Sequence, residues 1–429
     1  MRRLQWFFTV MFLLLSTQVE GRESSFIRVH GTRFMQGNKP YFFTGVNMWY
    51  ACILGSTPEG RRRLTAELDQ LKSMGVLNLR VLAASEKSRL VGSIPDAIQI
   101  SPGVCNEALL EGLDFAMAEI GKRGMTAVLF LNNYWQWSGG MAQYVSWTTG
   151  DTIPDPDRSG DWGSFMRFSA RFYSDARADA WYRRYVRTLV WRINRFTGKR
   201  YADDPAVMAW ELSNEPRPGT LGENSRSNAD AFLRWNRETA AFIHSLDPNH
   251  LVTTGSEGLV GCNRDTLLFL RTHDDPSVDY VNCHLWPKNW GWFDARRIDE
   301  TLAPSEAKAA EYFRTHMVLA RRLGKPLTLE EFGLDRDAGA LEPGTPTSAR
   351  DRFLSLLFRL VEDSAAAGSP IAGTNVWSWA GLGLPNQSPV GEPPSEPQGL
   401  NSVYGSDVST LSIFSSHAAR LKVMTERSP

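Results

Sequence analysis

The sequence predicts a single-domain (β/α)8 TIM barrel, an α/β fold with long loops after its strands. Eight short apolar stretches alternate with amphipathic ones along the 429-residue chain, and this alternation favours a closed parallel barrel over an open sheet. No Gly-x-Gly-x-x-Gly motif follows an early strand, which argues against a doubly wound dinucleotide-binding fold. The chain has no evident repeat, low-complexity tract or domain linker, so we expect the barrel to extend over residues 22–429.

The expected strands are short apolar stretches that run into polar or aromatic residues: Phe42–Tyr50, Val76–Leu82, Thr126–Asn133, Val207–Glu215, Leu251–Glu257, Val278–Trp286, Leu327–Gly333 and Gly373–Trp379. The expected helices are amphipathic: Arg61–Met74, Glu107–Arg123, Ala178–Phe196, Asn228–Leu246, Arg264–Thr272, Ser305–Leu323, Ser348–Ala366 and Ser409–Met424. A hairpin should precede the first strand, because Ile27–Val29 and Arg33–Met35 flank a Gly31-Thr32 turn. The Pro/Gly-rich segments Glu342–Thr347 and Gly381–Gly399 are expected to be barrel loops.

The first 21 residues have the pattern of a secretory signal peptide. Arg2 and Arg3 precede the apolar run Leu4–Leu15, which is too short to cross a bilayer as a helix. Cleavage after Gly21 would release a mature chain without a long apolar segment. We therefore expect an extracellular or periplasmic protein that has no contact with a membrane after cleavage.

Charge and cysteine content narrow the possible partners. Lysine plus arginine equals aspartate plus glutamate at 47 each, so no global charge attracts nucleic acid. We expect a monomer. The four cysteines either form two disulfides in one of three connectivities or stay free and buried, and the sequence leaves both alternatives open; they are Cys52, Cys105, Cys262 and Cys283. Their spacing does not match a zinc site.

Candidate catalytic residues lie at the end of the fourth expected strand. Pro216 ends this strand because proline has no N–H for the ladder. Side chains alternate across a strand, so Glu211, Ser213 and Glu215 are expected to point the same way. Polar groups at the carboxyl end of a barrel strand favour a catalytic position, although a carboxylate held by a structural arginine would give the same pattern.

A second carboxylate ends the seventh expected strand, where Glu330 and Glu331 are followed by Phe332-Gly333. Neighbouring strand residues point to opposite faces, so only one of the two glutamates is expected inside the barrel. Two strands that each end in glutamate supply the pair that glycoside hydrolysis requires. One carboxyl group protonates the leaving oxygen and the other faces the anomeric carbon.

Other polar and aromatic residues are expected at the same end of the barrel. Arg80 ends the second strand, where it could pair with Glu211 or keep a catalytic carboxylate ionised. His284 and Trp286 end the sixth strand two residues apart, so they face the same side. Trp377 or Trp379 on the eighth strand could form a floor under a sugar ring.

Two loops are rich in tryptophan, the one from Trp135 to Trp147 after the third strand and the one from Trp286 to Trp292 after the sixth. Their rings either pack against each other or form stacking platforms for sugars, since flat indole faces stack on the C–H faces of pyranose rings. Trp135 is a candidate for such a platform. An open cleft between these loops would hold several sugars of a chain and favour internal cleavage.

The motifs Asn214-Glu215-Pro216 and Glu331-Phe332-Gly333 resemble the acid/base and nucleophile motifs of glycoside hydrolase family 5. The stretch from Trp210 to Arg217 and the loop with Gly139-Gly140-Met141 look like its β-mannanase branch. The resemblance extends from about Phe26 to the last helix. It implies that Glu331 is the nucleophile, that Glu215 is the acid/base, and that no metal or organic cofactor is needed.

The same resemblance implies a set of substrate-binding residues, which are Arg80, Asn214, His284, Trp286 and Trp377. Trp286 stands where many members of the family have tyrosine, which leaves that position without a hydroxyl group for the nucleophile. For catalysis Glu215 must be protonated and Glu331 ionised when substrate binds, and the charge of Glu331 is expected to favour the protonated form of Glu215.

The expected function is therefore retaining endo-hydrolysis of β-1,4-mannosidic linkages in mannan, glucomannan or galactomannan by double displacement. A cellulase or another β-1,4-glycanase of the same fold is the nearest alternative. A barrel that only binds polysaccharide is a remote one, because binding alone does not require two carboxylates about 5 Å apart.

Overall fold

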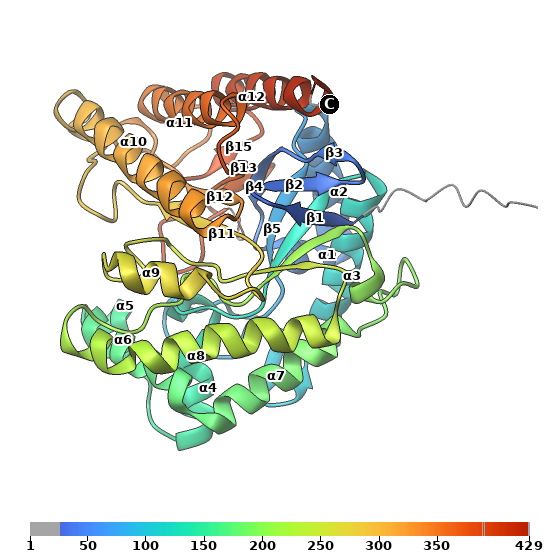
Figure 1. The fold of residues 1–429 in the computed structure, drawn as a ribbon, viewed down its shortest axis with the longest axis vertical. Helices are drawn as coiled ribbons and strands as arrows, with labels where there is room; N and C mark the ends of the chain where they lie inside the picture. The colour runs from blue at the N-terminus through green and yellow to red at the C-terminus, as the bar shows by residue number, and fades with distance from the viewer. Residues whose placement is uncertain (1–25, 388, 390, 428–429) are drawn as a thin grey trace, which may run out of the picture.

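Eight parallel strands form the central sheet of the protein (Figure 1). The computed structural model describes residues 26–387, 389 and 391–427, so the expected signal peptide lies outside the described residues. The order around the sheet is β10 (Leu251–Thr253), β9 (Val207–Glu211), β8 (Thr126–Phe130), β5 (Asn78–Leu82), β4 (Phe43–Asn47), β13 (Ile371–Val376), β12 (Leu327–Phe332) and β11 (Val281–Leu285). The first and last of these in the chain, β4 and β13, pair directly, and the predicted (β/α)8 barrel is confirmed.

The barrel closes between β10 and β11 by bonds from the segments around them. The amide of Asp279 donates to the carbonyl of Val252 at 2.8 Å, and the Thr253 hydroxyl donates to the carbonyl of Tyr280 at 3.0 Å. All eight predicted strands are present, but all except β5 end one to four residues earlier than predicted. The residues beyond each strand turn into loops, and these loops form the functional end of the barrel.

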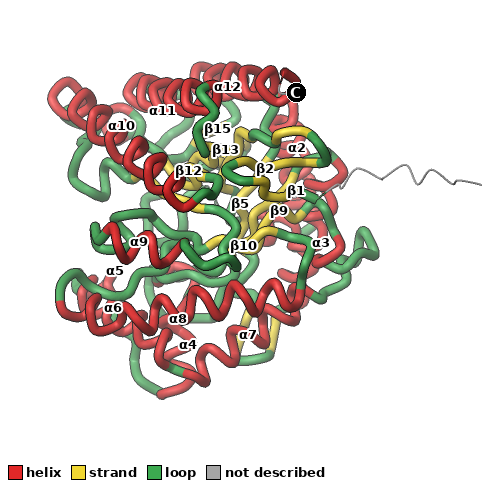
Figure 2. The backbone as a smooth tube through the Cα atoms, viewed as in Figure 1, coloured by secondary structure: helices red, strands yellow, loops and turns green. Residues whose placement is uncertain are grey.

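The predicted helices surround the barrel (Figure 2). The eight that match the expected amphipathic stretches are α2 (Pro58–Ser73), α3 (Glu107–Lys122), α7 (Ala176–Val190), α8 (Glu223–Leu246), α9 (Thr266–His273), α10 (Ile298–Leu323), α11 (Ser348–Ala366) and α12 (Val408–Arg427). The start of α2 shows a common helix-capping pattern. The hydroxyl of Thr57 accepts a hydrogen bond from the amide of Gly60 at 3.0 Å, and Pro58 is the first residue of the helix.

Further helices lie where the sequence predicted long loops. After β8 the chain forms α4 (Gly140–Thr149), α5 (Pro156–Ser159) and α6 (Trp162–Ser169), and α1 (Ala51–Gly55) follows β4. Short 3-10 turns are η1 (Gln136–Ser138), η2 (Ala170–Ser174), η3 (Tyr201–Asp203) and η4 (Asp337–Gly339). Two small sheets pair β6 (Gln99–Ser101) with β7 (Val104–Cys105) and β14 (Trp379–Gly381) with β15 (Val403–Tyr404).

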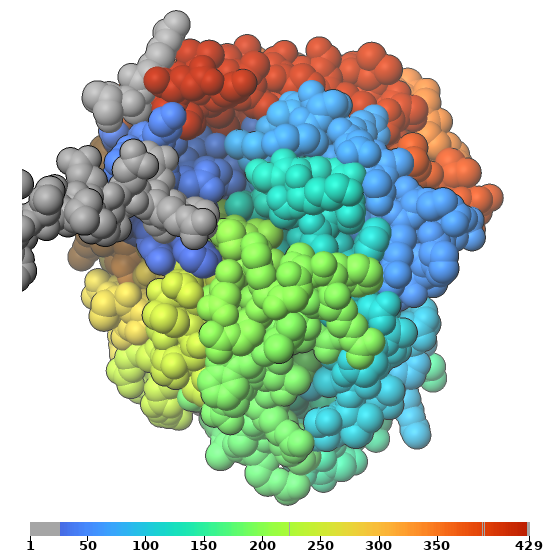
Figure 3. All heavy atoms as spheres, turned by 90° about the vertical axis from the view of Figure 1, so that its right-hand side faces the viewer, coloured from blue at the N-terminus to red at the C-terminus, as the bar shows by residue number. Residues whose placement is uncertain are grey.

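The predicted hairpin consists of β1 (Ile27–His30) and β2 (Arg33–Gln36), and β3 (Lys39–Pro40) extends it to three strands. It covers the amino end of the barrel, where Phe34 and Tyr41 pack with Phe43 and Tyr280 in a separate buried cluster. The last helix, α12, lies beside the early part of the chain (Figure 3) and contacts β4. The amino end is thus filled by side chains, so any substrate pocket must open at the other end.

All four cysteines are free thiols, and three of them are buried. This decides the alternative that the sequence left open in favour of free thiols, and the three buried thiols pack as small apolar side chains. Among the described residues, no helix combines the length and the apolar composition needed to cross a membrane.

Candidate active site

A pocket of about 520 Å³ opens at the carboxyl ends of the barrel strands. It is lined by Trp135, Gln136, Trp137, Asp157, Trp162, Asn214, Glu215, Arg217, Glu257, Val260, Trp286, Asn289, Trp290, Glu331, Trp377, Pro393, Ser395 and Glu396. Six of the eight candidate site residues from the sequence line the pocket. The other two are Arg80, which donates to Glu331, and His284, which contacts Glu215. The combination of tryptophan rings with carboxylates suits a sugar.

Glu331 lies on β12 and is almost fully buried, with 3 % of its surface exposed. Its Oε1 accepts a hydrogen bond from Nη1 of Arg80, and its Oε2 lies 3.2 Å from Nδ1 of His284. A nitrogen of Arg80 and one of His284 thus hold the two oxygens of this carboxylate in place. Glu331 therefore has the surroundings of a nucleophile.

Glu215 does not lie on a strand, because β9 ends at Glu211. Its backbone has a positive φ of 49°, which is uncommon outside glycine and occurs where a site constrains the chain. The amide of Glu215 donates to the carbonyl of Gly255 at 2.9 Å. The prediction that strand alternation orients Glu215 is therefore wrong, and a sharp turn before Pro216 aims it into the pocket instead.

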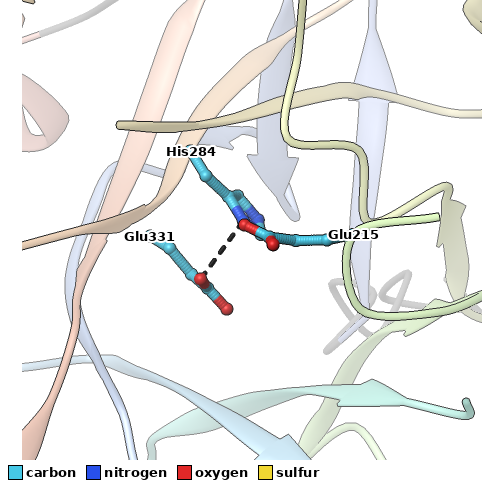
Figure 4. A group of neighbouring side chains, drawn as sticks. All are labelled: Glu215, His284 and Glu331. Atoms are coloured by element: carbon cyan, nitrogen blue, oxygen red, sulfur yellow. Dashed lines mark hydrogen bonds and ion pairs between the residues drawn. The ribbon is translucent and has the colours of Figure 1, made fainter. Parts of the chain in front are cut away.

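The side chain of Glu215 has two hydrogen-bonding partners. Oε2 accepts from the indole N–H of Trp135 at 2.6 Å, and Oε1 lies 2.7 Å from Nδ1 of His284. One carboxylate oxygen each of Glu215 and Glu331, together with Nδ1 of His284, lie within 4.8 Å of one another (Figure 4). A short carboxylate separation of about 5 Å is typical of glycosidases that retain configuration, whereas inverting enzymes need room for a water molecule.

Arg80 contacts Glu211, Asn214 and Glu331 at the same time. It binds Glu211 through Nε at 2.8 Å and Nη2 at 2.5 Å, and Nη2 also donates to Oδ1 of Asn214 at 2.8 Å. Burial alone would lower the pKa of Arg80, but the charges of Glu211 and Glu331 raise it above its usual value. Both pairings predicted for Arg80 are thus present in one residue.

His284 alters the expected protonation of the site. Burial alone would lower its pKa, but the charge of Glu331 and the hydrogen bond with Glu215 raise it to about 10. Burial alone would raise the pKa of Glu215, but the hydrogen bond and charge of His284 lower it to about 2. Both shifts favour a proton on His284 over one on Glu215 in the unliganded site, which is opposite to the expected effect of Glu331 on Glu215.

Comparison with known proteins agrees with this geometry. Residues 24–426 match the sequence profile described as GH family 5 beta-mannosidase-like. The chain belongs to glycoside hydrolase family 5. A putative mannan endo-1,4-beta-mannosidase 9 from Oryza sativa subsp. japonica is 32% identical over 84% of this chain and 82% of its own length. Mannan endo-1,4-beta-mannosidase 5 from Solanum lycopersicum is 29% identical over 87% of this chain and 85% of its own.

The crystal structure of a glycoside hydrolase family 5 mannosidase from Rhizomucor miehei superposes with a TM-score of 0.88. It is 32% identical and covers 95% of this chain and 100% of its own. A mutant of that enzyme was solved in complex with mannosyl-fructose, with a TM-score of 0.87 over 95% of this chain and 100% of its own at 32% identity. The family 5 chain therefore has relatives named both as endo-mannosidases and as a mannosidase.

The prediction for Glu330 in this family 5 enzyme is wrong. Glu330 was expected outside the barrel, because adjacent strand residues point to opposite faces. The pairing of β11 with β12 shifts at this point, so that Cys283 faces Leu329 but His284 faces Glu331. The extra residue is a β-bulge, and Glu330 points into the barrel, where Asn282 donates a hydrogen bond to it.

The tryptophans of the pocket agree only in part with the prediction. Trp286 and Trp377 line the pocket with ring centroids 6.0 Å apart, whereas Trp379 is fully buried. The expected platform from Trp135 to Trp147 is wrong at its far end, since α4 places Trp147 against the hydrophobic core. Trp292 packs on Trp290 at 4.9 Å and does not line the pocket.

Asn214 lines the pocket as predicted, but both ends of its amide have protein partners. Its Oδ1 accepts from Arg80, and its Nδ2 donates to Oδ1 of Asn133 at 3.1 Å. These bonds fix the orientation of the amide, and the second N–H of Nδ2 is the donor that a sugar hydroxyl could use. Asn214 therefore binds Arg80 firmly, and any contact with substrate uses the remaining capacity of Nδ2.

Sequence reasoning missed an ion pair in the pocket wall. Arg217 contacts Oε2 of Glu257, and the indole N–H of Trp290 donates to Oε1 of Glu257 at 3.1 Å. Burial raises the pKa of Glu257 to about 7 although the charge of Arg217 opposes it. A signal was present, because Glu257 ends the fifth expected strand and Arg217 directly follows Pro216.

A wall of three loops closes one side of the pocket. A Cβ at Gly92 would lie 2.1 Å from Oδ2 of Asp157 and 2.7 Å from Cβ of Ser395, so these three loops touch. Gln136 donates to Asp157 at 3.0 Å, which is a bond within the long segment that follows β8. On this side, the cleft expected between the tryptophan-rich loops is therefore bordered by three touching loops.

Glu215, His284 and Glu331 each also offer a donor atom that a cation could use. Nδ1 of His284 lies between the two carboxylates, and a protonated nitrogen has no lone pair for a metal. Arg80 and Trp135 already donate to the carboxylate oxygens. The absence of a functional metal stays a prediction.

Proposed function

We propose that this family 5 enzyme hydrolyses β-1,4-mannosidic linkages in mannan-type substrates with retention of configuration. The observation on which this rests is the pair Glu215 and Glu331, with carboxylate oxygens within 4.8 Å at the floor of a tryptophan-lined pocket. The names of the plant relatives and of the Rhizomucor miehei enzyme support mannose as the sugar. Their coverage of nearly the whole chain supports the same activity here.

In the first step Glu331 attacks the anomeric carbon while Glu215 gives its proton to the departing glycosidic oxygen. The bond from the sugar carbon to that oxygen breaks, and a covalent glycosyl-enzyme forms on Glu331. In the second step ionised Glu215 takes a proton from water, whose oxygen displaces Glu331. Two inversions at one carbon give net retention.

The proton on Glu215 comes from within the site. His284 holds it in the free enzyme, and Nδ1 lies 2.7 Å from Oε1 of Glu215. Substrate binding excludes water from the pocket and brings the glycosidic oxygen against Glu215, which favours its neutral form. The proton then moves from His284 to Glu215 without any exchange with solvent.

Arg80, Asn214, His284, Trp135, Trp286 and Trp377 are proposed as the substrate-binding residues. Trp377 forms the floor under the sugar that precedes the scissile bond, and Trp286 lies against it at 6.0 Å between ring centroids. Mannose differs from glucose in its axial 2-hydroxyl, so selection must occur at this sugar. Such a hydroxyl, when bonded, discriminates by on the order of 10⁴-fold against an analogue that cannot make the bond.

The direct test is to incubate the purified enzyme with mannan, glucomannan, xylan and carboxymethyl-cellulose. We expect short manno-oligosaccharides from linear mannan, slower cleavage of glucomannan and almost none of cellulose. Proton NMR of the first products should show the β-anomer. Faster release of sugars from carboxymethyl-cellulose than from mannan would indicate a cellulase that uses the same mechanism. Binding of polysaccharide without turnover would indicate a polysaccharide-binding barrel.

A second candidate is removal of single mannose units from chain ends. The contact of Gly92, Asp157 and Ser395 favours it, because this wall limits how many sugars fit on one side of the scissile bond. Mannohexaose labelled at its reducing end distinguishes the two modes. Endo-hydrolysis gives labelled products of several lengths from the start, whereas exo-hydrolysis gives mannose and labelled mannopentaose first.

We also propose that the enzyme is secreted, acts as a monomer on polysaccharide, and needs neither nucleic acid nor a membrane. The arginine pair and the apolar run at the N-terminus support secretion. Expression with and without residues 1–21 tests it: only the full chain should reach the culture medium. Light scattering coupled to gel filtration tests the oligomeric state.

A further inference from the structure

Glu330 is buried beneath the catalytic pair without a role in the double displacement. It is 1 % exposed, and the β-bulge at His284 and Glu331 turns it into the barrel. Asn282 donates to its Oε2, and the Tyr280 hydroxyl lies 3.5 Å from its Oε1. These are neutral partners. Within the described residues, the only cationic side chain paired with it is His284, with Nε2 at 4.0 Å from Oε2.

The Nε2 atom of His284 is the ring nitrogen on the side of Glu330. Nδ1 is used twice, by Glu215 at 2.7 Å and by Glu331 at 3.2 Å. Nε2 is buried and has no hydrogen-bond partner. An imidazolium has a proton on each nitrogen, so the proton on Nε2 faces the carboxylate of Glu330.

We propose that Glu330 is a positioning residue, which keeps His284 protonated on both nitrogens so that Nδ1–H remains available to Glu215. The proposal deepens the glycosidase mechanism above and rests on it. Glu330 itself touches neither substrate nor the reacting atoms. It acts through His284, by placing a negative charge on the far side of the ring.

A second histidine in the same protein gives a natural comparison. His417 on α12 also has Nδ1 at 2.7 Å from a carboxylate, that of Glu362, and its Nε2 is also buried without a partner. No carboxylate is paired with that Nε2 among the described residues. Burial lowers the pKa of His417, and Glu362 does not offset it. Arg420 pairs with the same Glu362 at 2.7 Å and also opposes a proton on His417, so one carboxylate that shares its charge with an arginine does not hold this buried ring as an imidazolium.

The charges that face His284 come from three elements. Glu330 and Glu331 lie on β12, Glu215 follows β9, and the more distant Glu211 and Glu257 lie at the ends of β9 and after β10. Arg80 neutralises Glu211 and one oxygen of Glu331. No arginine or lysine among the described residues forms an ion pair with Glu330, whose charge acts on Arg80 only from a longer distance, so His284 is its paired cation.

The first measurement needs no substrate. Long-range ¹⁵N–¹H spectra of the imidazole rings report the state of each nitrogen. In the unmodified protein both nitrogens of His284 should have imidazolium shifts from pH 6 to pH 9. A neutral ring with one bare nitrogen at pH 7 would overturn the proposal, even if no variant folds.

The second measurement uses Glu330→Gln, which removes the charge and keeps the shape. Loss of a charge at this distance should lower the pKa of His284 by about one to three units. In the profile of kcat/KM against pH, the alkaline limb should move to lower pH by a similar amount. Glu330→Asp keeps the charge and should restore the limb most of the way. A lower kcat at every pH without a shift of the limb or of the His284 titration would show a merely structural role and would overturn the proposal.

Glu362→Gln is the matched control, because it removes a carboxylate from a buried histidine outside the site. It should change the spectrum of His417 and leave that of His284 and the alkaline limb unchanged. If no glycan is cleaved at all, the proposed function fails, whereas the titration of His284 still decides the role of Glu330. The two failures are therefore distinguishable.

Discussion

Arg80 and His284 divide the buried carboxylates of the site between them. Arg80 holds Glu211 and Glu331, whereas His284 lies between Glu331 and Glu215. Burial raises the pKa of Glu211 to about 8 in spite of Arg80, which limits the negative charge that accumulates near neutral pH. The role of each carboxylate thus depends on which cation it contacts, and single substitutions test these roles.

Replacing Glu331 by alanine should reduce turnover by on the order of 10⁴-fold or more. Azide fits the vacated space and should restore part of the activity. Because it attacks from the face of the lost carboxylate, the product should be the α-glycosyl azide. In Glu215→Ala azide should instead attack the glycosyl-enzyme and give the β-azide, which NMR distinguishes. The reverse pattern of azides would exchange the two roles.

Replacing Arg80 by alanine should destabilise the fold by about 3–5 kcal/mol, because it leaves Glu211 and Glu331 buried without their cation. Urea denaturation at pH 7 measures the free energy of unfolding. Arg200→Ala is the control, since its pair with Asp203 is about half exposed on each side and should matter little. Equal losses in both variants would contradict a structural role for the buried network.

At the scale of elements, the turn at Glu215 and the bulge at Glu330 determine where the functional groups point. Both lie just where a strand ends, at the carboxyl side of the barrel. The segments after β10 are held by two buried histidines: His316 Nε2 accepts from the amide of Leu259 at 2.9 Å, and His273 Nε2 lies 3.1 Å from the Thr254 hydroxyl. These bonds position the loop that contains Glu257.

These two histidines should make stability fall in mild acid. Burial lowers the pKa of His316 to about 4 and that of His273 to about 3, against about 6.5 in an unfolded chain. Below pH 6.5 the unfolded state therefore binds more protons, so the free energy of unfolding decreases as pH falls toward 4. Each histidine should remove about 2 kcal/mol between pH 7 and pH 5.

The test compares unfolding by urea at pH 7 and pH 5 in the unmodified chain and in His316→Gln. The variant retains an acceptor for the Leu259 amide but does not titrate, so its loss of stability between the two pH values should be smaller by about 2 kcal/mol. The same loss in both proteins would show that His316 does not contribute to the acid sensitivity.

At the scale of the whole molecule, the hairpin closes the amino end of the barrel, while the loops surround the other end. The division between a packed end and a functional end is a general property of this fold. The pocket brings together carboxylates and an imidazole, which are groups that can perform acid/base and nucleophilic steps. The molecule therefore has the groups needed for hydrolysis within one chain.

Prolonged dialysis against a chelator should leave hydrolysis of mannan unchanged, because Arg80 and His284 supply the positive charge next to Glu331. Activity before and after dialysis is the measurement, with thermal unfolding as a control for a structural ion. A loss that one particular divalent cation reverses would assign a metal to the site.

The sequence by itself determined the fold class, and it supplied Glu215 and Glu331 as the candidates for the reacting residues. Strand and helix periodicity is a local property, so all eight strands and the surrounding helices could be read from it. Glu215 and Glu331 were found for the same reason, since each lies in a short motif at the end of an apolar stretch. The aromatic content predicted a sugar site, because Trp135, Trp286 and Trp377 lie just beyond strands.

Only the tertiary structure decided how those residues are aimed and charged. Strand alternation would orient Glu215 and exclude Glu330, but a left-handed turn and a β-bulge override it, and both depend on pairing with strands far away in sequence. The proton on His284 depends on Glu331 and Glu215, which lie on different elements. The wall at Gly92 depends on three distant loops. Such contacts are not local, so no pattern along the chain contains them.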